Sequence, residues 1–111
     1  MMITKIRNRW SLTAGAALLL LGTQAYAHNP MCQCEEHGTE EIRCTGGFSD
    51  GSGAPGVTLD VISYDENILV PGKLGDDSTI TFKRPDGEFY VLFDAGPGHV
   101  VEVDHTEIGG Q

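Results

Sequence analysis

The clearest structural signal in the sequence is the run VTLDVISY at residues 57–64. Its apolar residues Val57, Leu59 and Val61 alternate with other side chains, and this period of two is typical of a half-buried β-strand. The polar residues 65–67 follow directly and have the composition of a turn. The run therefore predicts a strand with one face against a core.

Similar short runs lie on both sides of this strand and are separated by turn residues. Expected strands cover residues 31–36, 40–45, 68–70, 79–82, 89–93 and 99–103. The run at 89–93 is almost continuously apolar, so we expect it to be central in its sheet. No run has a helical period, and residues 106–111 are expected to be frayed. About seven short strands predict a single all-β domain, a small Ig-like β-sandwich.

Residues 1–27 have the pattern of a secretory signal peptide. Basic residues near the start are followed by an apolar stretch at 14–22, which is shorter than the ~20 residues that span a bilayer. The tripeptide Ala-Tyr-Ala at 25–27 has the small side chains that a signal peptidase requires. We therefore expect cleavage after Ala27. The product would be a periplasmic domain of residues 28–111, with no stable membrane insertion.

The expected mature chain is strongly acidic. Residues 28–111 contain all sixteen acidic residues and four basic ones, a net charge of −12 with neutral histidine. Nucleic acid is a poor partner for such a surface, whereas metal cations or a basic protein patch suit it better. The charge could equally serve only to keep a small domain soluble. We find no phosphate-binding loop, nucleophile elbow or dinucleotide fingerprint, and we do not expect an enzyme.

Three cysteines are expected on one face of the first hairpin. Cys32 and Cys34 are two residues apart on a predicted strand, so their side chains share a face. A hairpin loop at 37–39 would place Cys44 opposite Cys32, and a loop at 37–41 would place it opposite Cys34. One disulfide with a spare cysteine is the simplest arrangement in an oxidising compartment. A thiolate site for Cu(I) or Zn(II) and thiol exchange with a partner are the alternatives.

Cleavage after Ala27 would make His28 the amino terminus. The α-amine and the imidazole Nδ1 of one residue can close a chelate ring on a transition metal ion such as Ni(II), Cu(II), Co(II) or Zn(II). The other histidines carry weaker signals. His37 is expected in the hairpin turn, while His99 and His105 share one face of the last strand, where a satisfied core or edge histidine is the simpler interpretation.

A series of motifs between residues 48 and 104 is similar to a family of periplasmic carboxypeptidase-regulatory-like, prealbumin-type sandwiches, some of which are associated with nickel or cobalt uptake. The matching segments are FSDG at 48–51, Pro55, the strand at 57–65, Gly-Lys at 72–73, the hairpin at 79–91 and AGPGH at 95–99. Members of that family often begin the mature chain with histidine after Ala-x-Ala. The resemblance implies that His28 binds metal, with His99 as a second ligand.

Taken together, these patterns predict a periplasmic metal-binding protein that buffers nickel, cobalt, copper or zinc or delivers it to an inner-membrane transporter. His28 would anchor the ion, and one or more other side chains would complete the site: Cys32, Cys34, His37, Cys44 and His99. Two alternatives remain at this level. One is a structural or interaction module whose cysteines form only a staple, and the other is a thiol-exchange protein.

Overall fold

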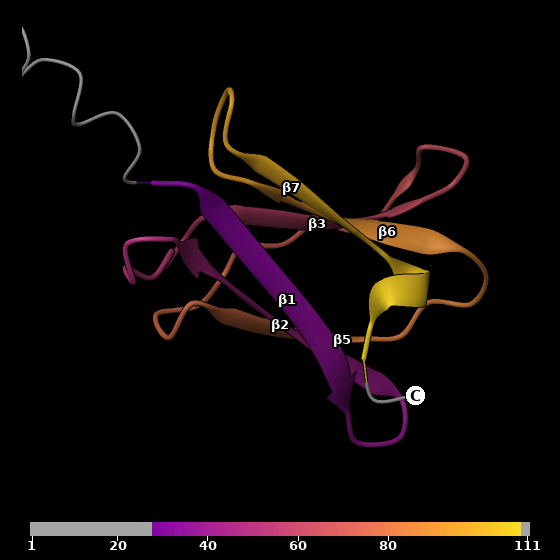
Figure 1. Cartoon of the computed structure of the whole chain (residues 1–111). Helices are drawn as coiled ribbons and strands as arrows, with labels where there is room; N and C mark the ends of the chain where they lie inside the picture. Colours follow the sequence, from indigo (N-terminus) through magenta and orange to yellow (C-terminus); the bar gives the residue numbers. More distant parts are fainter. Residues whose placement is uncertain (1–27, 110–111) are drawn as a thin grey trace, which may run out of the picture.

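A computed structural model describes residues 28–109 of the chain, and the predicted signal peptide lies outside these residues. Seven strands form two antiparallel sheets that face each other (Figure 1). In chain order the elements are β1 (Pro30–His37), β2 (Glu41–Phe48), β3 (Thr58–Ser63), β4 (Ile68–Val70), β5 (Thr79–Lys83), β6 (Phe89–Asp94), β7 (Val100–Asp104) and the 3-10 turn η2 (His105–Glu107). The predicted all-β sandwich of about seven strands is confirmed.

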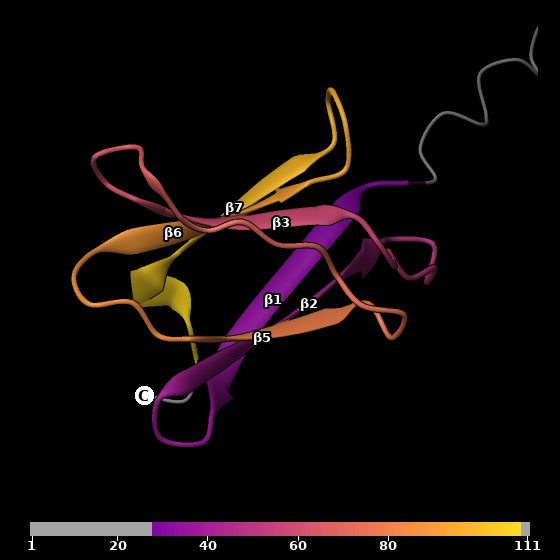
Figure 2. The same cartoon turned by 180° about the vertical axis from the view of Figure 1, so that it is seen from behind.

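The two sheets enclose one hydrophobic core. The smaller sheet has the strand order β1-β2-β5 and the larger one β4-β3-β6-β7 (Figure 2). Leu59 and Val61 on β3 are fully buried, as the alternation in the sequence predicts. The strand β6 lies between β3 and β7 and contributes Phe89, Val91 and Phe93 to the core, which confirms its expected central position. Residues 28–109 contain no helix with the length and apolar character needed to span a bilayer.

The β1–β2 hairpin adopts the second of the two expected registers. Cys34 pairs with Cys44, but the pairing extends to His37 and Glu41, so the loop is residues 38–40 and is shorter than the expected 37–41. The strand β2 continues beyond the predicted end at residue 45, because its glycines stay paired with β1 as far as Phe48. A Cβ atom at Gly46 would lie 2.7 Å from Cε1 of Phe93, so only glycine lets β2 approach the facing sheet this closely. This register also determines that the residues after Phe48 lie beside the residues before Pro30.

The expectation that residues 106–111 are frayed is wrong for the part that the structure describes. The turn η2 is capped by Asp104, and the side chain of Ile108 is fully buried. Beyond it, the carbonyl of Gly109 accepts a hydrogen bond from the Glu36 amide at 3.3 Å, and the Gly109 amide donates to the Cys34 carbonyl at 3.4 Å. One buried isoleucine between polar and glycine residues leaves no periodic signal in the sequence. The last segment therefore packs against the first strand.

Candidate functional site

The predicted ligand residues do not form one cluster. They occupy four places: His28 directly before β1, Cys32, Cys34 and Cys44 on the inner face of the β1–β2 hairpin, His37 at the end of β1, and His99 in the β6–β7 turn. Across residues 28–109, no group of three or more His, Cys, Asp or Glu side chains is arranged to hold a metal ion. The four places are therefore four separate candidate sites.

Two of the three cysteines are joined to each other. Cys34 and Cys44 form a disulfide across the paired strands, with their Cα atoms 4.0 Å apart. Both side chains are buried in the core. A disulfide sulfur is not a thiolate, so neither residue offers a metal ligand while this bond is intact. The expected disulfide is confirmed, and its role in the described structure is to link β1 to β2.

The third cysteine, Cys32, is a half-buried free thiol. It lies opposite Gly46 in the hairpin and packs against the core. Burial raises the pKa of the Cys32 thiol to about 11. The thiolate is the form that binds soft metals and attacks disulfides, and at neutral pH it is a small minority at this position. These surroundings favour neither a thiolate metal site nor rapid thiol exchange.

Neither His37 nor His99 is placed to complete a site at His28. His37 lies at the far end of β1, and His99 is hydrogen-bonded within its own turn. His28 lies two residues before β1 and His37 is the last of its eight residues, so the length of the strand, roughly 25 Å at about 3.3 Å per residue, separates them. His37 therefore cannot share a coordination shell with His28. His99 precedes β7 rather than starting the strand, because the glycines of the β6–β7 turn take positive φ values up to the residue before it. Its Nδ1 lies 3.1 Å from the carbonyl oxygen of Pro97, which accepts a hydrogen bond from it.

His28 has a carboxylate partner that the sequence interpretation missed. Its Nε2 lies 3.0 Å from Oδ2 of Asp50, and its ring meets the Phe48 ring edge-on with the centroids 6.3 Å apart. The other oxygen of Asp50, Oδ1, accepts hydrogen bonds from the amide and the hydroxyl of Ser52 at 2.9 and 2.7 Å. These bonds from Ser52 are the main reason why the pKa of Asp50 is lowered. The carboxylate is thus held as an anion beside the imidazole.

The contact with Asp50 determines which ring nitrogen of His28 is open. A carboxylate oxygen only accepts, so Nε2 carries the hydrogen, and in the neutral form of the ring Nδ1 is then the nitrogen with the lone pair. The His28 side chain is 60% exposed. The sequence does contain a signal for the pair, because extending the Pro30–Phe48 pairing by two residues places His28 opposite Asp50. The two residues are brought together by the register of the hairpin.

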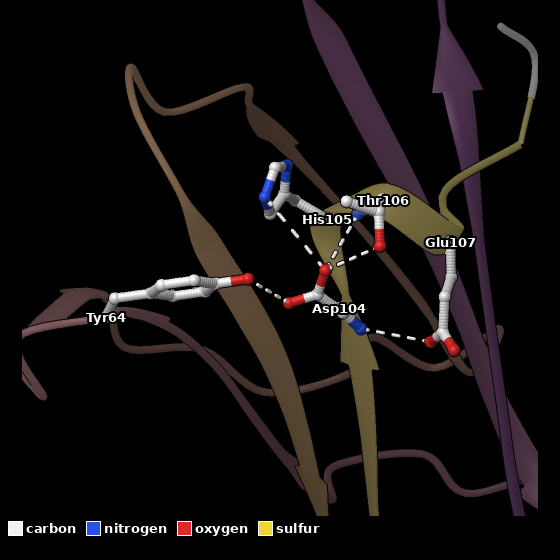
Figure 3. Close-up of polar contacts among 5 residues, drawn as sticks. All are labelled: Tyr64, Asp104, His105, Thr106 and Glu107. Carbon is white, nitrogen blue, oxygen red and sulfur yellow. Dashed lines mark hydrogen bonds and ion pairs between the residues drawn. The ribbon is translucent and has the colours of Figure 1, made fainter.

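A second polar cluster joins the β3–β4 turn to the end of β7 (Figure 3). Asp104 accepts hydrogen bonds from the Tyr64 hydroxyl at 2.6 Å and from the amide and hydroxyl of Thr106, while Glu107 accepts from the Asp104 amide. The Thr106 hydroxyl is the first cause of a lowered pKa of Asp104, about 2, and the bond to Asp104 raises the pKa of Tyr64 to about 12. The ring of His105 lies beside this cluster. Its bonds are those of a helix cap, so we assign it to stability.

A search with protein-family models gives no match for this chain, and neither the curated proteins nor the solved structures that were compared with it give one.

Proposed function

We propose that the protein is processed after Ala27 and binds a transition metal ion through its new amino terminus, His28. The α-amine and Nδ1 of this residue would hold the ion, and nickel, cobalt, copper and zinc all accept such nitrogen ligands. The observation that carries the proposal is the state of Nδ1. In the neutral ring it is the nitrogen with the lone pair, because Asp50 contacts Nε2, and it belongs to an exposed residue whose amine the cleavage would release.

The role we propose is buffering or hand-over of the ion in the periplasm, with an inner-membrane metal transporter as the receiving partner. His28 is exposed and lies at the surface before the first strand, so another ligand can reach the ion without the domain opening. The net charge of −12 over residues 28–111 raises the local concentration of cations. The cysteines are not needed for this role, because two are bonded to each other and the third is largely protonated.

The test compares two forms of the exported protein that differ by one residue. The first begins at His28, and the second has one glycine inserted between Ala27 and His28. Ni(II), Co(II), Cu(II) and Zn(II) are titrated into each by calorimetry. The inserted glycine moves the amine away from the imidazole, and we expect the tightest of these ions to bind roughly 100-fold more weakly when one arm of the chelate is lost.

Two controls separate this site from the other candidates. His37→Ala and Cys32→Ser should leave the affinity unchanged, because neither side chain contacts His28. Intact mass of the exported protein establishes whether the chain begins at His28. A different terminus, or no binding of any of the four ions at micromolar concentrations, would contradict the proposal. The second result would favour the structural or interaction module instead.

A further inference from the structure

We infer that Asp50 is a positioning residue for His28, a role that rests on the proposed function. In this role Asp50 does not bind the ion. It holds the hydrogen on Nε2 of the imidazole and so leaves Nδ1 as the nitrogen that binds metal. Only Nδ1 is close enough along the side chain to share an ion with the amine of the same residue. Asp50 would thereby select the chelating form of His28.

The position of the Asp50 carboxylate is set by the end of β2. The amide of Phe48 donates to the Ser52 carbonyl at 3.0 Å, and the amide of Gly51 donates back to the Phe48 carbonyl at 2.9 Å. This tight turn carries Asp50 at its outer corner, and Ser52 occupies one carboxylate oxygen with two hydrogen bonds. The remaining oxygen, Oδ2, faces His28 at 3.0 Å. The carboxylate is therefore oriented before any ion arrives.

The chain at His28 is held by contacts of its own. The Asn29 amide donates to the Ser49 hydroxyl at 3.1 Å, and the Ser49 amide donates to the Asn29 carbonyl at 2.8 Å. The Phe48 ring, which packs against Phe93 in the core, meets the His28 ring edge-on. The imidazole is thus restrained by an aromatic side chain as well as by the carboxylate. An outer carboxylate that orients an imidazole in this way typically contributes 10–100-fold to metal affinity.

The decisive variant is Asp50→Asn. Ser52 would still donate to the amide oxygen, so the NH₂ group of the new side chain would face Nε2 of His28 and donate to it. The hydrogen of the ring would then move to Nδ1 and block the chelate. We expect long-range ¹H–¹⁵N NMR spectra to show hydrogen on Nε2 in the original protein and on Nδ1 in the variant. We also expect Ni(II) or Cu(II) to bind about 10–100-fold more weakly.

Matched controls exclude a charge effect and a loss of fold. Asp86→Asn removes the same charge from an exposed turn on another part of the surface and should leave both readouts unchanged. Ser52→Ala keeps the carboxylate but releases one of its hydrogen bonds, and a smaller loss in the same direction is expected. Circular dichroism verifies the β-fold of each variant.

The outcomes distinguish this inference from the function on which it rests. The position of the ring hydrogen is measured without metal, so it tests Asp50 even if no ion binds. Equal metal affinity and an unchanged ring hydrogen in Asp50→Asn would overturn the positioning role while leaving the chelate intact. Loss of an oxygen donor from the Cu(II) electron paramagnetic resonance spectrum of the variant would place Asp50 among the ligands and also overturn it. Failure of the original protein to bind would contradict the proposed function itself.

Discussion

At the scale of single residues, Asp104 illustrates how a surface carboxylate can stabilise a fold without being buried. It accepts hydrogen bonds from Tyr64, which follows β3, and from Thr106 in the turn η2. These bonds favour the ionised form of Asp104 and the protonated form of Tyr64, which explains why the pKa values of the two groups move in opposite directions. The hydrogen bond between Tyr64 and Asp104 therefore makes the free energy of unfolding depend on pH in both the acidic and the alkaline range.

The opposite shifts of these two pKa values predict how Tyr64→Phe changes the pH dependence of stability. The folded pKa of Asp104 is about 2, below its ordinary value of 3.8, so its contribution is present above pH 3.8 and is lost as the pH falls toward 2. The folded pKa of Tyr64 is about 12, above 10.0, so its contribution is complete below pH 10 and is lost as the pH rises through 12. Tyr64→Phe should reduce stability at neutral pH and flatten the alkaline part of the curve.

Urea denaturation at a series of pH values measures both effects. Asp104→Asn should remove the acid-side dependence that this contact contributes. The double variant should be less destabilised than the sum of the two single variants, because both remove the same hydrogen bond. Strictly additive losses would show that Tyr64 and Asp104 act independently.

Ser78 shows a residue-scale feature that the sequence does not reveal. Its φ is 67°, in the left-handed region that usually favours glycine. The Ser78 hydroxyl accepts a hydrogen bond from the buried Ala54 amide at 2.8 Å, so a serine here serves a backbone group that would otherwise lack a partner. The contact joins residues 24 positions apart. A hydrogen bond between residues this far apart cannot be predicted from the sequence around Ser78.

At the scale of elements, the β1–β2 hairpin carries both the candidate site and the only disulfide among residues 28–109. The bond between Cys34 and Cys44 closes a short loop, with a sequence separation of 10. It holds the register that places His28 opposite Asp50 two pairs beyond the last ladder pair. The stability of this hairpin therefore also bears on the geometry of the proposed metal site.

We expect the double variant Cys34→Ala/Cys44→Ala to lower the free energy of unfolding by about 2–3 kcal/mol, the amount that chain entropy assigns to a closed loop of this length. Guanidinium denaturation of the non-reduced protein and of the variant measures the difference. Cys32→Ser serves as the control for altering a cysteine without breaking the bond. If the variant were as stable as the original protein, the strand pairing alone would account for the hairpin.

Elements with regular alternation could be predicted from the sequence, and features that depend on their pairing could not. The strand around Leu59 is predicted by its alternation, and the strand around Phe89 by its almost continuous apolar run. The hairpin register remained open between two loop lengths, and each predicted a different cysteine pair. Ile108 was missed because a single buried residue has no period. Asp50 was missed because its place beside His28 follows from a register that sequence spacing alone does not fix.

At the scale of the whole molecule, charge is the dominant surface property. The sixteen acidic residues of 28–111 face only four basic ones, and one of these, Arg84, pairs with Glu36 at 3.0 Å. The remaining excess of carboxylates repels itself in the compact state, which lowers the stability of the folded domain. The same excess attracts cations, which agrees with the proposed function.

The midpoint of thermal unfolding should therefore rise with sodium chloride, because salt screens this repulsion. The expected change is a few degrees, at about 4–8 °C for each kcal/mol of repulsion that is removed from a domain of this size. Differential scanning calorimetry between about 10 mM and 500 mM salt measures it. Near pH 4, where many carboxylates are protonated, the dependence should become weak. An equally strong dependence there would point to a specific ion effect.

The pairing of Gly109 with β1 also has a consequence for biosynthesis. A ribosome completes the first strand long before it reaches the residues that cover the outer edge of that strand. The buried Ile108 is added at the same late stage, so the core lacks one of its side chains until then. The β1 edge therefore stays uncovered, and the core lacks the Ile108 side chain, until these two residues have been synthesised, so the domain of residues 28–109 can complete its packing only after Gly109 has been made.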